Sequence, residues 1–97
     1  MQAAEKVVDS MVVAVPSNLV ARKDPKAVVS LNNVGKYVSE SNSNSTVIVK
    51  ARSQSEYEFM VASMQNGYKQ QINPPKEVKY EYARLERGVS SVEVRHA

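Results

Sequence analysis

Residues 24–49 read DPKAVVSLNNVGKYVSESNSNSTVIV, and this stretch decides the fold because a helix, a loop and a strand follow one another in it. Asp24 predicts the N-cap of the helix, since its carboxylate can accept hydrogen bonds from the free amide groups of the first turn. Pro25 suits the first helical position, where its missing N–H costs nothing. Apolar residues recur along one helical face at Ala27, Val28, Leu31, Val34 and Val38. We expect this helix to end near Ser39.

The remainder of the stretch predicts a loop and a buried strand, and a second helix follows it. Residues 40–45 are polar, with side chains that compete for backbone hydrogen bonds, so they favour a loop. Residues 46–49 are all β-branched and predict a strand. Ser53 and Glu56 have the capping-box spacing at the start of a second helix, which Asn66-Gly67 would end. The apolar stripe of this helix is Tyr57, Met60, Val61 and Met64.

Three more segments predict strands. Residues 11–15 favour a buried strand, although their spacing also fits a helical face. Residues 78–82 and 92–95 each alternate apolar with charged side chains, the pattern of a half-exposed strand, and we expect them to pair as an antiparallel hairpin. The predicted order is β-α-β-α-β-β. It defines an α+β fold, a single-layer, mostly antiparallel sheet with two helices packed on one face.

Composition is consistent with one small domain. The 97 residues suit a single unit over 1–97, with residues 1–6 and 96–97 expected to be frayed. The absence of cysteine excludes disulfides, thiolate zinc sites and cysteine nucleophiles. The longest apolar run, residues 11–15, is too short to cross a bilayer, and the first residues lack the layout of a signal peptide. We therefore expect a soluble, cytoplasmic domain.

The sequence offers no recognisable catalytic apparatus. His96 is the only histidine, and a frayed terminus would not hold a general base in a fixed position. The carboxylates suggest solvated faces, and the three glycines are too far apart for a phosphate-binding loop. We expect no enzymatic activity, no cofactor and no metal.

Tyrosines near basic residues indicate one alternative function. Aromatic rings on a sheet can stack bases while neighbouring cations meet phosphates, and the net charge of +3 is compatible with such binding. The residues of this candidate nucleic-acid surface are Lys79, Tyr80, Tyr82, Arg84 and Arg87. The competing interpretation is that Tyr80 and Tyr82 face the core.

Three short segments carry a family resemblance: residues 18–22 (NLVAR), the helix end at residues 35–37 (GKY) and residues 49–53 (VKARS). Together they resemble the histidine phosphocarrier (HPr-like) family, and the likeness covers roughly residues 11–65. The resemblance implies that Val20 stands in place of the phosphorylated histidine, so phosphoryl transfer would be lost. It aligns Arg22 with the family's active-site arginine and Ser53 with a serine that a kinase modifies in some members. Lys23-Asp24 before Pro25, and a strand in place of the last helix, depart from the family.

These observations predict a non-enzymatic binding or regulatory module that recognises another macromolecule, most simply a protein. The candidate partner-binding residues are Arg22, Ser53, Lys36 and Tyr37. The alternatives are the basic nucleic-acid-binding domain and a structural or assembly subunit. In the assembly alternative, the edge at residues 89–95 would pair with another copy.

Overall fold

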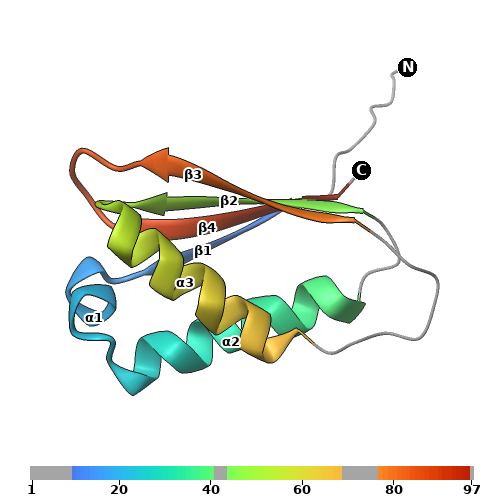
Figure 1. Cartoon of the computed structure of the whole chain (residues 1–97), viewed down its shortest axis with the longest axis horizontal. Coiled ribbons are helices and arrows are strands. Elements are labelled where there is room, and N and C mark those ends of the chain that lie inside the picture. Colours follow the sequence, from blue (N-terminus) through green and yellow to red (C-terminus); the bar gives the residue numbers. More distant parts are fainter. Residues whose placement is uncertain (1–9, 41–43, 69–76, 97) are drawn as a thin grey trace, which may run out of the picture.

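A four-stranded sheet carries its helices on one side (Figure 1). The structure, a computed structural model, describes residues 10–40, 44–68 and 77–96. The elements are β1 (Ser10–Val15), α1 (Ser17–Arg22), α2 (Pro25–Glu40), β2 (Ser45–Ala51), α3 (Gln54–Gly67), β3 (Val78–Arg84) and β4 (Ser90–His96). The predicted α+β class is confirmed. The expectation of frayed ends at residues 1–6 and 97 lies outside the described residues, and none of the described helices is both long and apolar enough to cross a membrane.

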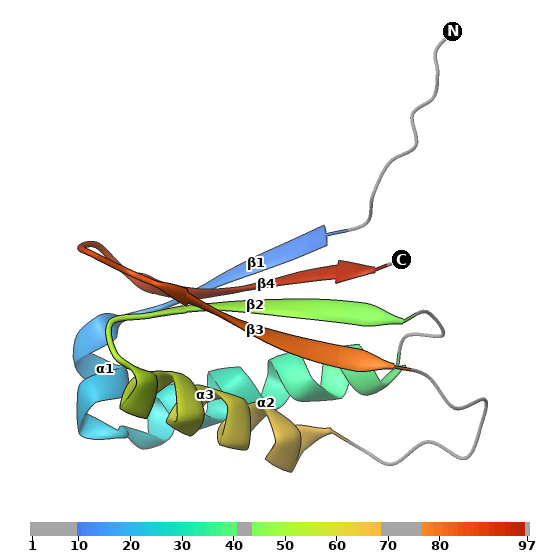
Figure 2. The ribbon, with the colours of Figure 1, turned by 45° about the horizontal axis from the view of Figure 1, so that its top comes forward.

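The strands lie in the order β1-β4-β2-β3 (Figure 2). β4 is antiparallel to β1 and to β2, whereas β2 and β3 run parallel, so the sheet is mixed. The predicted hairpin between residues 78–82 and 92–95 is therefore wrong, because β2 lies between them. Val92 and Val94 of β4 are fully buried, while β3 carries Lys79 and Glu81. β4 therefore occupies a central position, whereas β3, none of whose residues is fully buried, takes the edge.

This strand order also corrects the expected free edge at residues 89–95. β4 has a hydrogen-bonded neighbour on each side, β1 and β2, and cannot add another strand. The two edges of the sheet are instead β1 and β3.

Valine lines the covered face of the sheet. Alternate residues of each strand point toward α2 and α3, which confirms that two amphipathic helices shelter a valine-rich stripe. The buried apolar side chains of the strands are Val15, Val47, Val49, Ala51, Val92 and Val94, and those of the helices are Val20, Ala27, Leu31, Val34, Val38, Met60 and Met64.

A third helix, α1, goes beyond the two that the sequence predicts. It has six residues, too few to show a helical repeat of apolar positions. Lys23 ends it in the left-handed region, with φ of 54°, and the Asp24 N–H donates to the carbonyl oxygen of Leu19 at 2.9 Å. The turn lets α2 begin at once, and Val20 of α1 closes one end of the core.

Both predicted helix caps are present. The Lys26 N–H donates to Asp24 Oδ1 at 2.9 Å, and the Glu56 N–H donates to Ser53 Oγ at 3.2 Å. Each cap satisfies a backbone donor that the helix itself leaves without a partner. α3 ends at Gly67, as predicted, and α2 runs one residue past Ser39.

Glycine allows α2 and α3 to approach closely. A methyl group on Gly35 of α2 would overlap the carbonyl oxygen of Met64 in α3. Likewise, a methyl group on Gly67 of α3 would overlap the carbonyl oxygen of Asn32 in α2. The two helices therefore meet backbone to backbone at two points, and glycine is required at both.

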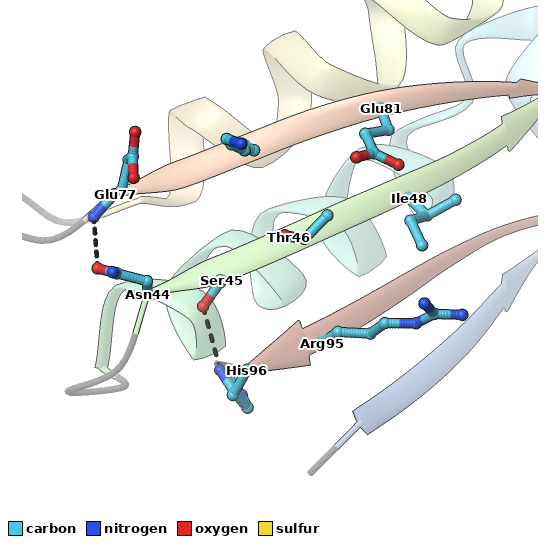
Figure 3. A pocket seen from close by; sticks show the side chains of 9 residues that line it. Asn44, Ser45, Thr46, Ile48, Glu77, Glu81, Arg95 and His96 are labelled. Atoms are coloured by element: carbon cyan, nitrogen blue, oxygen red, sulfur yellow. Dashed lines mark hydrogen bonds between the residues drawn. The ribbon is translucent and has the colours of Figure 1, made fainter. Parts of the chain in front are cut away.

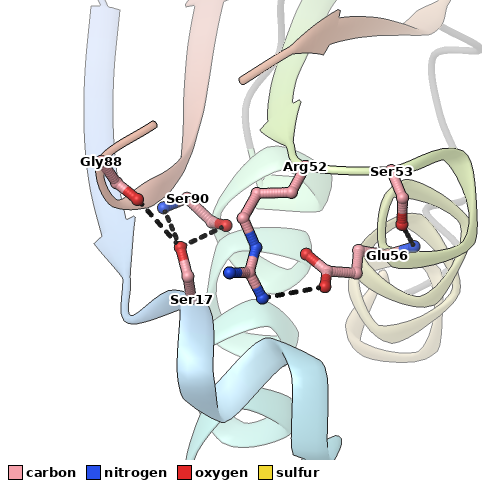
Figure 4. A network of polar contacts seen from close by, with 6 residues as sticks. All are labelled: Ser17, Arg52, Ser53, Glu56, Gly88 and Ser90. Carbon is pink, nitrogen blue, oxygen red and sulfur yellow. Dashed lines mark hydrogen bonds and ion pairs between the residues drawn. The ribbon is translucent and has the colours of Figure 1, made fainter. Parts of the chain in front are cut away.

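A polar network fastens α1 to the segment between β3 and β4 (Figure 4). Ser17 Oγ donates to the carbonyl oxygen of Gly88 at 3.1 Å and accepts from the Ser90 N–H at 3.0 Å. Ser90 is fully buried, so the hydrogen bond from Ser17 satisfies a backbone N–H that is removed from water. Nearby, Arg52 and Glu56 form an ion pair at 3.2 Å beside the start of α3.

Candidate functional site

The second face of the sheet is the open face, which no described helix covers (Figure 2). Because side chains alternate along a strand, the residues between the buried ones point to this face. They are Ser10, Val12 and Ala14 of β1, Ser91, Glu93 and Arg95 of β4, Thr46, Ile48 and Lys50 of β2, and Lys79, Glu81 and Ala83 of β3. The open face thus carries most of the charge of the sheet.

A hollow of about 440 Å³ lies on the open face, where β2 and β3 begin and β4 ends (Figure 3). Its lining comes from three strands that are distant in sequence. The lining residues are Asn44, Ser45, Thr46, Ile48, Glu77, Lys79, Glu81, Arg95 and His96. Asn44 Oδ1 accepts from the Glu77 N–H at 2.9 Å, which joins the starts of β2 and β3.

Two rows of opposite charge cross the open face at the hollow, which three of their four residues line, Arg95, Lys79 and Glu81. The strand register places Arg95 and Lys79 on either side of Thr46, which forms the cationic row. Two residues further along β2, the register places Glu93 and Glu81 on either side of Ile48, and these two carboxylates form the acidic row. Along β3 and along β4, a basic and an acidic side chain therefore follow one another on the open face. Across the sheet, side chains of the same sign lie on either side of β2.

Arg95 links the two rows. Its Nε donates to Glu93 Oε2 at 2.9 Å. This hydrogen bond, the charge of Glu93 and the more distant charge of Glu81 raise the pKa of the Arg95 guanidinium above its usual value. The cation is therefore permanent, and Figure 3 shows its side chain extended along the open face. The ion pair with Glu93 holds the guanidinium there.

His96 closes the end of the hollow, which corrects the expectation that it is frayed. It is the last residue of β4 and pairs with Ser45 of β2. His96 Nδ1 shares a hydrogen bond with Ser45 Oγ at 3.1 Å, and its Nε2 shares one with the Tyr37 hydroxyl at 3.2 Å. The ring thus ties together β2, β4 and α2. Ser45 is only 3% exposed, so this chain of hydrogen bonds fits a structural clasp better than a nucleophile.

The four candidate partner-binding residues do not form one surface. Arg22 pairs with Asp24 at 3.2 Å, and Ser53 caps α3, so both lie at the end of the molecule where β1 and β2 finish. Lys36 and Tyr37 lie in the second half of α2, where Tyr37 contacts His96 at the opposite end of the sheet.

The candidate nucleic-acid residues are divided between the two faces. Lys79 lies on the open face, whereas Tyr80 and Tyr82 point to the helix side. Tyr80 packs against the core, as the competing interpretation predicted, but Tyr82 is 37% exposed. Tyr82 stacks at 5.0 Å between ring centroids on Tyr57 of α3. Arg84 ends β3 on the helix side, and Arg87 lies beyond the strand. The sheet therefore does not present these cations and rings together.

The tyrosine cluster beside α3 makes stability depend on pH. Burial raises the pKa of the Tyr80 hydroxyl, and Tyr68 and Tyr57 raise it further. The usual value is about 10, so above that pH the unfolded chain releases a proton that the folded chain still holds. We expect the free energy of unfolding to be unaffected by this group below about pH 10 and to fall as pH rises further. Urea titrations across this range should show a smaller fall for Tyr80→Phe than for the original chain.

Sequence reasoning missed most of the hollow. Thr46, Glu81 and Arg95 belong to predicted strands, but their meeting depends on a strand order that the sequence pattern does not reveal. The signal for Glu81 and Arg95 is the alternation of charged with apolar side chains in residues 78–82 and 92–95. Within the described ranges, no group of histidine or acidic side chains could hold a metal ion.

Comparison with protein-family models, with curated proteins and with solved structures found no significant match to this chain. The resemblance to the histidine phosphocarrier family therefore stays a prediction. In the structure its aligned residue Val20 is buried in α1, and Arg22 is exposed at the end of the same helix.

Proposed function

We propose that this chain is a non-enzymatic module that recognises another protein through the hollow on its open face. One observation carries the proposal: a cationic row lies beside an acidic row on a sheet face that no described element covers. Polar rows of this kind provide charge complementarity, which sets the specificity of an interface more than its raw affinity.

The spacing of the rows fits an extended peptide. Side chains on one face of a strand repeat every ~6.8 Å, which is also the separation of the cationic and acidic rows. Arg95 and Lys79 belong to strands on either side of β2, about 9.6 Å apart, which leaves room for a chain lying over Thr46 and Ile48. The matching ligand is an extended segment with an acidic and a basic side chain two residues apart.

Three side chains of types that also occur in catalytic sites have a structural role at the end of the hollow. Ser45, His96 and Tyr37 hold one another at the end of the hollow and fix the start of β2 against the end of β4. A rim held in this way keeps the cationic and acidic rows in fixed positions, so the chain loses little conformational entropy when a ligand binds.

A peptide library displayed on phage tests the proposal. The immobilised chain is expected to enrich peptides with acidic and basic side chains two positions apart. The double variant Lys79→Glu with Glu81→Lys keeps the net charge but mixes the signs within both rows. It should bind the enriched peptides about tenfold more weakly, because two favourable charge contacts become unfavourable.

A matched control separates this loss from a general charge effect. Arg84→Glu with Glu86→Arg makes the same exchange on β3 and just beyond it, outside the hollow, and should leave peptide binding unchanged. Enrichment of unrelated peptides, or equal binding by the Lys79/Glu81 variant, would contradict the proposal. Salt-sensitive retardation of a single-stranded oligonucleotide would instead favour the nucleic-acid alternative.

A further inference from the structure

β1 is an unprotected edge strand. It reads SMVVAV and carries no charged side chain, and the nearest proline, Pro16, lies just beyond its end. The other edge, β3, carries Lys79, Glu81 and Arg84. Proteins protect sheet edges from strand addition with charge, proline or bulges, and in this sheet only β3 has such protection. The contrast indicates that the outer side of β1 receives another strand.

An apolar groove of about 250 Å³ runs between β1 and α2. Met11 and Val13 line it from the strand, and Ser30, Asn33, Val34 and Tyr37 line it from the helix. Three of the five exposed large hydrophobic side chains in the described part of the chain belong to the same two elements. They are Val12 at 64% exposed, Val29 at 59% and Tyr37 at 39%.

The outer side of α2 is complementary to itself. Lys26, Asn33 and Glu40 follow one another at seven-residue spacing and therefore lie on one stripe of the helix. When two such helices lie antiparallel, centred on Asn33, Lys26 of each faces Glu40 of the other. The same arrangement places Val29 opposite Tyr37. A charge pattern that matches its own two-fold image is what an interface between identical copies requires.

The strand and the helix can share one two-fold axis, because Val13 and Asn33 line the same groove. Antiparallel pairing of β1 with its copy, centred on Val13, puts Met11 opposite Val15. All three of these side chains lie on the helix side of the sheet. The pairing thus keeps the helices of both copies on the same side and joins the two sheets into one.

We infer that the partner of this surface is a second copy of the chain, joined through β1 and the Lys26–Asn33–Glu40 stripe of α2. The inference is independent of the proposed function, since the hollow lies on the other face and remains open in the dimer. One strand and one helix make a small interface, so we expect dissociation in the range of about 1 to 100 µM.

Sedimentation equilibrium over a wide concentration range tests this dimer. The mass should rise from the 10.7 kDa of one chain toward twice that value. Lys26→Glu alone, or Glu40→Lys alone, places like charges together at two symmetric positions and should weaken the dimer about tenfold. Both substitutions together restore opposite charges and should return the dissociation constant to within about threefold of the original.

The double variant makes the result specific, because damage to folding would not be repaired by a second substitution. Lys50→Glu, on the open face, is the matched control and should leave the dimer intact. Val12→Lys places a charge on the edge strand and should abolish it. A chain that stays monomeric at millimolar concentration, or a dimer that is insensitive to Lys26→Glu, would overturn the inference.

Discussion

Replacing Gly35 by alanine is expected to destabilise the domain by roughly 2 kcal/mol or more. Helix propensity alone predicts the opposite sign, because alanine is favoured over glycine inside a helix by about 1 kcal/mol. The packing effect is larger, since the added methyl group would overlap the carbonyl oxygen of Met64. That oxygen belongs to the backbone of α3 and cannot turn away as a flexible side chain would. Urea unfolding followed by circular dichroism measures the change.

Lys36→Ala provides the matched control for Gly35→Ala. It creates alanine at the next position of α2, where the native side chain is exposed, and should change stability by no more than about 0.5 kcal/mol. Gly67→Ala tests the reciprocal contact with Asn32 and should also be destabilising. A Gly35→Ala variant that is more stable than the original chain would show that α2 and α3 do not meet there.

Features that depend on near neighbours in the chain could be predicted from the sequence. Asp24 and Ser53 cap the helices that follow them, and the apolar stripe from Ala27 to Val38 faces the core. Each depends on spacing within a few residues, where helical geometry determines which side chains meet. The alternation in residues 78–82 and 92–95 similarly predicted two strands with unlike faces.

Features that depend on distant pairing could not be predicted. β3 and β4 are consecutive in the chain, which favours a hairpin, yet β2 lies between them. The alternation within each strand indicates which of its faces is buried, but it does not specify which strands become neighbours, so the place of β4 between β1 and β2 could not be predicted. The cationic and acidic rows follow from that strand order, so their meeting in one candidate site could not be predicted. The ordered position of His96 could not be predicted for the same reason, because its partners Ser45 and Tyr37 lie far away in the sequence.

Lysine substitutions at two neighbouring residues of β2 are expected to have opposite outcomes. Val47 is fully buried between the sheet and the helices, and Val47→Lys places a charge there without a partner. The cost is several kcal/mol, on the order of 4 or more, which is enough to unfold a domain of ordinary stability. Thermal unfolding and near-ultraviolet circular dichroism should show a chain without a cooperative transition.

Ile48→Lys makes a charge change of the same sign one residue away, on the open face. The register places this residue between Glu93 of β4 and Glu81 of β3, so the new ammonium group gains two opposite charges across the strands. Cross-strand ion pairs contribute about 0.2 to 1 kcal/mol each, so stability should be unchanged or slightly increased. Because both variants add one lysine to the same strand, neither net charge nor strand propensity can explain a difference between them. Equal damage from the two substitutions would mean that the open face is covered, and the charge rows could not then serve as a binding surface.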